Sequence, residues 1–167
     1  MAALAQKKPL AVDSNLLFDL AAKKDFALTL LDLAKERGYS LHIPPTVVQE
    51  LAYAAAFHHG EEQRLAITAL QNLRAWEITP FDLVAVGHGI TEQFARRLHQ
   101  LNLLPVEELN DGLIVAETAL AGIPVLLSSD HHLNDIDEAD LCQVCRERDL
   151  AEVRIVHPRK LLRAWRK

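Results

Sequence analysis

The feature that most constrains the fold of this chain is the alternation of short apolar runs with longer segments of helical periodicity. Runs typical of strands lie at 9–13, 41–43, 124–127 and 153–156, and residue 78 could mark a further short strand. Between them, apolar residues recur at mostly helical spacing. Strands joined by helical crossovers pair in parallel and are normally covered on both faces. The pattern predicts an α/β fold with a central, mainly parallel sheet and helices on both sides.

The length and composition of the chain indicate one compact domain. It has 167 residues, of which half are apolar and a quarter charged, and it has neither an internal repeat nor a linker. We expect one domain over 1–167, with a core at about 9–157 and a basic C-terminal helix at 158–167. Two cysteines are too few for a disulfide scaffold, and no segment approaches the ~18 apolar residues of a membrane span. We therefore expect a cytoplasmic protein without a membrane partner.

The charge of the chain is acidic and unevenly distributed. Eighteen Lys and Arg residues face 23 Asp and Glu residues, which gives a net charge of −5. From residue 154 onward there are six basic residues and no acidic ones, so the remainder carries −11. This balance argues against a uniformly basic surface that holds nucleic acid. The acidic residues are the better candidates for chemistry.

Four acidic residues stand where a parallel sheet would gather them. Asp13 and Asp130 each come just after an apolar run, and Glu50 and Asp111 lie near the starts of two predicted helices. In an open parallel sheet the functional crevice lies beyond the carboxyl ends of the strands, where the following helices begin. We expect these four carboxylates to share that crevice, provided that the strands are neighbours.

Carboxylates gathered in this way repel one another, and each raises the pKa of the others. Two divalent cations would balance four negative charges, and Mg²⁺ or Mn²⁺ prefers oxygen ligands. A pair of such ions serves in-line phosphoryl chemistry, in which one activates water and the other stabilises the leaving oxygen. The interpretation predicts a Mg²⁺ or Mn²⁺ site.

Three of the four acids also have a simpler interpretation. Asp13 could cap the following helix, Asp111 could lie near a helix N-terminus for its dipole, and Glu50 could be an exposed helix acid. Thr46 and Gln49 have the T-x-x-Q spacing of a capping box.

Two further patterns with metal or redox associations are weaker. A zinc site at His131 and His132 is disfavoured, because adjacency points their side chains apart and no third soft ligand stands nearby. Cys142 and Cys145 are expected to be two reduced thiols.

Four segments around these acids carry a family resemblance. They are VDSNLL at 12–17, PTVVQEL at 45–51, NDGLIVA at 110–116 and LSSDHHL at 127–133. In this order and spacing they resemble the four acidic motifs of the PIN-domain nucleases, over about 10–156. Among prokaryotic members of that family, the VapC-type toxins are the most populous group.

The resemblance implies a three-layer α/β/α domain and a Mg²⁺- or Mn²⁺-dependent endoribonuclease. By position, Asp13, Glu50, Asp111 and Asp130 would be the catalytic, metal-binding acids. Asn15 and Ser128 would give polar support near the metal, and Asp135, in an acidic stretch after Asp130, could complete the metal shell or be solvated. The resemblance also implies RNA as substrate, and the chain could be the toxin of a toxin–antitoxin pair, with an antitoxin partner or a second copy bound to it.

Basic residues could hold RNA from the rim of an acidic site. The candidates are two in a predicted helix and three near the C-terminus, beside Trp165 as a stacking face: Arg96, Arg97, Arg159, Lys160 and Arg163. The C-terminal cations could equally serve only the dipole of their helix.

Other functions remain open. A catalytically silent PIN fold that binds RNA or protein would keep the same acids. A haloacid-dehalogenase-like phosphatase would carry a second Asp where this chain has Asn15, which argues against that class.

Overall fold

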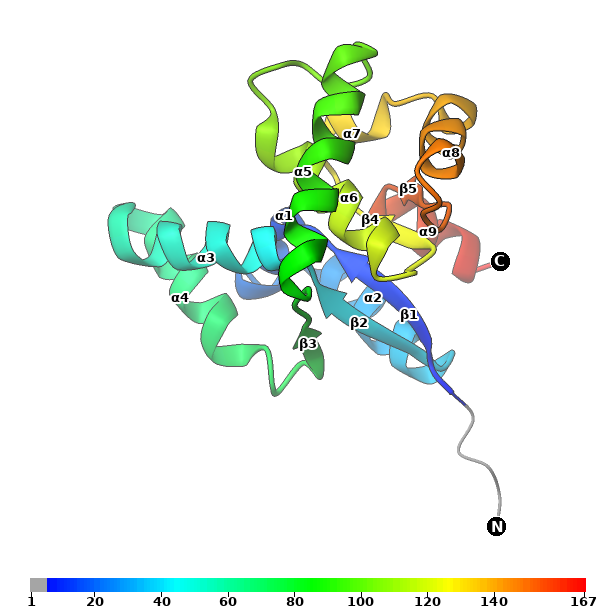
Figure 1. The fold of residues 1–167 in the computed structure, drawn as a ribbon. Helices are drawn as coiled ribbons and strands as arrows, with labels where there is room; N and C mark the ends of the chain where they lie inside the picture. Colours follow the sequence, from blue (N-terminus) through cyan, green and yellow to red (C-terminus); the bar gives the residue numbers. More distant parts are fainter. Residues whose placement is uncertain (1–5) are drawn as a thin grey trace.

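A computed structural model describes residues 6–167 and contains one sheet of five strands (Figure 1). The strand order is β3-β2-β1-β4-β5, and every pair of neighbours is parallel. The sheet confirms the expected α/β class, and its short strands match the apolar runs of the sequence. The strands are β1 (Lys8–Val12), β2 (Tyr39–Ile43), β3 (Ile78–Pro80), β4 (Val125–Leu127) and β5 (Arg154–Val156).

Helices make all the connections between the strands. In chain order they are α1 (Ser14–Ala21), α2 (Asp25–Glu36), α3 (Pro45–Phe57), α4 (Gly60–Asn72), α5 (Ala85–Gln100), α6 (Leu109–Leu120), α7 (His131–Asn134), α8 (Glu138–Glu147) and α9 (Pro158–Trp165).

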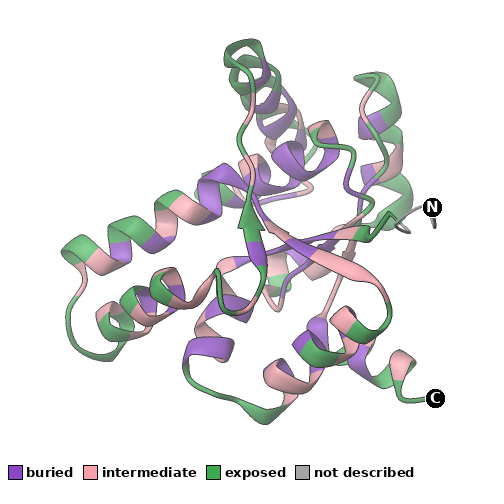
Figure 2. Cartoon of the chain, turned by 90° about the horizontal axis from the view of Figure 1, so that it is seen from below, coloured by how far each residue is buried: buried purple, intermediate pink, exposed green. Residues whose placement is uncertain are grey.

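Helices cover both faces of the sheet, as parallel strands require. In Figure 1, α2 lies behind β1 and β2, whereas α5 and α6 pack along each other in front. The pair α3 and α4 projects to one side, and α4 also packs against α1. Buried positions gather on the helix faces that turn toward the sheet (Figure 2). This arrangement leaves the carboxyl edge of the sheet bordered by α1, α3, α6 and α7.

Two glycines end helices at this sheet. Gly38 follows α2 and Gly122 follows α6, with φ angles of 75° and 71°. Side chains with a Cβ rarely adopt this left-handed conformation, so glycine allows the chain to leave each helix and enter the next strand.

Two local expectations need correction or refinement. The capping box at Thr46 is wrong, because Pro44 occupies the cap position and α3 begins at Pro45 with no hydrogen bond from the side chain of its cap residue. The polar stretch after Asp130 contains the short helix α7.

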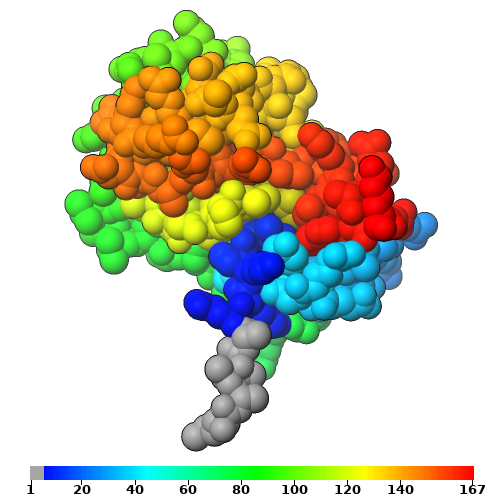
Figure 3. All heavy atoms as spheres, turned by 90° about the vertical axis from the view of Figure 1, so that its right-hand side faces the viewer, coloured from blue at the N-terminus to red at the C-terminus, as the bar shows by residue number. Residues whose placement is uncertain are grey.

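The basic C-terminal helix packs against α2 (Figure 3). The guanidinium of Arg159 lies 3.8 Å from the centre of the Phe26 ring. The ring of Trp165 lies 5.1 Å from that of Tyr39, and its backbone oxygen accepts a hydrogen bond of 2.5 Å from Arg37. Trp165 therefore serves the packing of α9 in this structure. Within residues 6–167, no helix has the length and apolar character needed to cross a membrane.

We expect Gly112→Ala to destabilise the fold through the contact between α5 and α6. A Cβ at Gly112 would lie 3.0 Å from the Cβ and 3.3 Å from the Cα of Ala95, where the backbone cannot give way. Overpacking of this kind costs about 1–3 kcal/mol. The matched control is Gly89→Ala in α5, where a Cβ meets nothing within 4 Å and should be neutral or stabilising. Urea unfolding of both variants measures the difference, and equal stabilities would contradict the prediction.

Candidate active site

The site begins with Asp13, directly after β1. Strand β1 pairs with β4 so that Val12 lies opposite Leu127, which sets Asp13 beside Ser128 at the carboxyl edge. The Ser128 hydroxyl donates to Asp13 Oδ2 at 2.6 Å, and the Ser14 N–H donates to Oδ1 at 2.7 Å. Burial raises the pKa of Asp13, and these hydrogen bonds oppose the rise. Both oxygens of this buried carboxylate therefore have a donor.

Asp130 lies two residues after Ser128 and starts α7. Its Oδ1 accepts from the N–H groups of His132, at 2.7 Å, and Leu133, at 3.3 Å. Its own N–H donates to the Ser128 hydroxyl at 3.1 Å. Ser128 thus connects Asp13, which follows β1, with Asp130, which follows β4.

Glu50 reaches the same edge from α3, which follows β2. Asn110, in the first turn of α6, donates from Nδ2 to Glu50 Oε1 at 3.1 Å. Burial raises the pKa of Glu50, and the charge of Asp13 adds to the rise. The predicted supporting residue Asn15 lies in α1 and borders the cavity in front of Glu50.

Asp111 is the least satisfied of the four acids. Only 9% of the residue is exposed, and its buried Oδ2 has no hydrogen-bond partner among residues 6–167. Burial, followed by the charges of Asp130, Asp13, Glu108 and Glu50, raises its pKa to about 8. The strand register and the hydrogen bonds of Asp13, Asp130 and Glu50 place these residues at the same carboxyl edge as Asp111.

A buried link fixes the two helices that carry Glu50 and Asp111. Glu117 of α6 accepts from the backbone N–H of Thr46 at 3.1 and 3.2 Å, and from its hydroxyl at 2.5 Å. Thr46 lies in the first turn of α3, where N–H groups lack partners within the helix. Glu117 is 3% exposed, so these bonds hold it in the interior between the helices. The carboxylate of one helix thus caps the other.

Sequence reasoning missed Glu108, Asn110 and Glu117. Glu108 immediately precedes α6 and lies 3.7 Å from His132 Nε2. Its place in an acidic pair just before Asn110 and Asp111 was a usable signal, whereas nothing local marked Glu117. Asp135 lies exposed at the end of α7, and its charge is not among those that most affect Asp111.

The histidine pair behaves differently from the expectation. The rings of His131 and His132 approach to 3.9 Å between centroids, so adjacency does not point them apart. In the described part of the chain, no three His, Cys, Asp or Glu side chains already stand in a metal-binding geometry.

The residues at the carboxyl edge nevertheless suit a hard divalent cation. Their donor atoms are carboxylate oxygens, which Mg²⁺ and Mn²⁺ prefer. The unpartnered Oδ2 of Asp111 is a buried acceptor that a cation would satisfy, and positive charge would offset the repulsion that raises its pKa. Asp111, with Asp13, Asp130 and Glu50, could hold such a metal ion.

Most of the candidate RNA-binding cations have acidic or aromatic partners. Arg96 lies 3.9 Å from Glu92 and Arg97 lies 3.8 Å from Glu147, while Arg159 covers the Phe26 ring. Arg163 is exposed in the last turn of α9. A fifth cation, Lys160, borders a cavity of about 350 Å³ that also includes Asn134. Asn134 donates to the backbone oxygens of Ser128 and Asp130, so Lys160 lies on the side of the site toward β5.

Comparisons with known proteins agree with this architecture. The family model described as PIN domain matches residues 10–139. A solved structure, the crystal structure of VapBC2 from Rickettsia felis bound to a DNA fragment from their promoter, is similar with a TM-score of 0.59 and 19% sequence identity. The similarity covers 77% of this chain and 92% of that chain, and at this identity it supports the fold. Comparison with curated protein sequences finds no significant match.

We expect Asp111→Asn to stabilise the metal-free protein. At neutral pH, folding must bury the Asp111 charge among other carboxylates or take up a proton, whereas an amide does neither. An increase in Tm of about 2–4 °C, which is near 1 kcal/mol for a chain of this size, is expected in EDTA. The same variant should lose most of the rise in Tm that Mn²⁺ gives the wild type. Asp32→Asn, an exposed change in α2, is the control and should alter neither value.

The link between α6 and α3 gives a second prediction. Glu117→Ala leaves the Thr46 N–H and hydroxyl without their acceptor, which should cost about 1–3 kcal/mol. Glu117→Gln keeps one acceptor oxygen and should recover part of that loss. Thermal unfolding of the two variants tests this, and a Glu117→Ala protein as stable as wild type would show that the link contributes nothing.

Proposed function

Because the chain belongs to the PIN-domain family, we propose that it is a nuclease of the metal-dependent kind that cuts RNA. The observation that carries the proposal is the buried, unpartnered carboxylate of Asp111 among three further acids. Groups that form such a cluster destabilise the metal-free fold, and this is typical of a functional site.

The proposed roles follow from the contacts of each residue. Asp13, Asp111, Asp130 and Glu50 would hold Mg²⁺ or Mn²⁺. Ser128 would orient Asp13 through its hydroxyl, and Asn110 would orient Glu50 through its amide. When bound, the divalent ions supply activation of the attacking water and stabilisation of the leaving oxygen.

The charge of the site sets how RNA would be held. Four carboxylates repel a phosphodiester, so productive binding needs the cations in place. Lys160, on the β5 side of the site, would contact a neighbouring phosphate. Asp135 is exposed and could hold a water at the rim.

The binding partners of this chain are proposed from its similarity to a VapBC2 structure. VapBC2 of the similar structure is a complex bound to a promoter DNA fragment. By analogy we infer that this chain is the toxin of a toxin–antitoxin pair, acts in the cytoplasm and could form a homodimer. Co-purification with the product of an adjacent reading frame tests the antitoxin partner.

The direct test is cleavage of RNA by pure protein with Mn²⁺. We expect Asp13→Asn and Asp111→Asn each to lower the rate by about two orders of magnitude or more, since each removes a ligand charge. Ser128→Ala, which removes the hydroxyl that donates to Asp13 and accepts from the Asp130 N–H, should cost about 10–100-fold. EDTA should abolish the activity and Mn²⁺ should restore it.

Two outcomes would refute this mechanism. Cleavage that persists in EDTA excludes a role for divalent ions, and full activity of Asp13→Asn excludes its role as a ligand. Stabilisation by Mn²⁺ without cleavage of transfer RNA, ribosomal RNA or DNA would instead favour a catalytically silent fold.

A further inference from the structure

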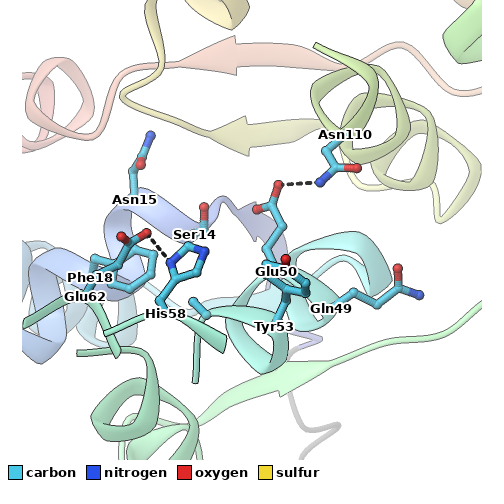
Figure 4. Close-up of a pocket in the computed structure, with 10 residues that line it drawn as sticks. Ser14, Asn15, Phe18, Gln49, Glu50, Tyr53, His58, Glu62 and Asn110 are labelled. Atoms are coloured by element: carbon cyan, nitrogen blue, oxygen red, sulfur yellow. Dashed lines mark hydrogen bonds and ion pairs between the residues drawn. The ribbon is translucent and has the colours of Figure 1, made fainter. Parts of the chain in front are cut away.

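A cavity of about 520 Å³ is lined in part by Glu50, one of the proposed catalytic acids (Figure 4). Its volume is in the range of sites that bind small organic groups. Ser14 and Asn15 come from α1, Glu50 and Tyr53 from α3, and Asn110 from α6. Because Glu50 belongs to both the cavity and the acidic cluster, an occupant of the cavity would lie next to the proposed reaction site.

Two aromatic rings form the apolar part of the cavity. Phe18 lies one helical turn after Ser14, and Tyr53 lies one turn after Glu50, so both rings share a face with a site residue. Tyr53 is 60% exposed, and its ring lies 4.9 Å from the Phe57 ring and 5.6 Å from the His58 ring. These neighbours restrict the ring while leaving part of its surface open, as a stacking platform requires.

The polar lining favours an uncharged ligand group over a phosphate. No Lys or Arg is among the described residues that line the cavity. Its imidazole, His58, lies 2.9 Å from a carboxylate oxygen of Glu62. Glu50 and Glu62 repel phosphate, whereas the amide of Gln49 offers both a donor and an acceptor.

We infer that this cavity receives an unpaired nucleobase of the RNA strand, from a nucleotide next to the bond that is cut. The inference rests on the proposed function and adds the part of the substrate that the site selects. Proteins recognise single-stranded RNA by stacking bases on aromatic rings and by hydrogen bonds to base edges. Tyr53 and Phe18 supply the stacking surface, and Gln49 and Asn15 supply groups that can read the base edge. The sugar and phosphate stay outside, toward the metal ligands.

The test combines a protein change with a substrate change. Tyr53→Ala removes the ring from an exposed position, and Tyr53→Phe keeps it as the matched control. Each is assayed on an unstructured hexaribonucleotide that the wild type cuts, and on versions with an abasic nucleotide on either side of the cut. We expect Tyr53→Ala to lower kcat/KM about 10- to 100-fold on the intact strand. For one of the abasic strands, the wild-type kcat/KM should be about 10- to 100-fold lower than on the intact strand. On that same strand, Tyr53→Ala should have nearly the same kcat/KM as wild type.

The outcomes separate this inference from the proposed function. If wild type cuts RNA and Tyr53→Ala cuts the intact strand equally well, the inference is overturned, the nuclease stands, and the cavity is left for a peptide partner. The inference is also overturned if Tyr53→Ala lowers kcat/KM, relative to wild type, by the same factor on the intact strand and on both abasic strands. If wild type cuts no RNA, fluorescence anisotropy with Mn²⁺ decides. Homohexamers of adenylate, cytidylate or uridylate must then bind more tightly than a fully abasic hexamer, and equal affinities refute the inference.

Discussion

The parallel pairing of β1 with β4 is the constraint on which the candidate site depends. Its register places Asp13 beside Ser128 at the point where both strands have ended. The helices that follow β1 and β4 begin there, and α3 begins at the same edge beyond β2. Side chains from distant parts of the sequence meet because parallel strands end on one side of the sheet. Any change of register between these two strands would separate Asp13 from Ser128.

The sequence was sufficient to predict the features that depend on local signals. Asp13 and Asp130 follow apolar runs, so their position at strand ends could be read directly, and the class of the sheet followed from the helical connections. Glu117 could not be found in this way, because its partner Thr46 is 71 residues away in the chain. Thr46 itself was misread, since Pro44 and Pro45 start the helix earlier and a distant carboxylate replaces the local cap.

The site lowers the stability of a fold that is otherwise closely packed. Asp111 brings to a buried position a carboxyl group whose Oδ2 has no partner in the described part of the chain. The neighbouring Gly112 has no Cβ, which allows α5 to pack closely against α6 at Ala95. The close contact and the Glu117 link keep α6 in place despite the repulsion at its first turn. Helix α6 therefore carries both a residue that lowers the stability of the fold, Asp111, and residues that raise it, Gly112 and Glu117.

The acids of the site differ in how many hydrogen-bond donors their oxygens have, and this difference suggests different roles in metal binding. The carboxylate of Asp13 has a hydrogen-bond donor on each oxygen, so the fold already stabilises its charge without a cation. Asp111 has an oxygen without a hydrogen-bond partner among the residues that the structure describes, so a bound cation would satisfy that oxygen. Because α6 is joined to α3 through Glu117 and through Asn110, cation binding there would also hold Glu50 and the wall of the cavity that carries Tyr53. Under the proposed function, cation binding and placement of the substrate base would thus be coupled through the same two helices.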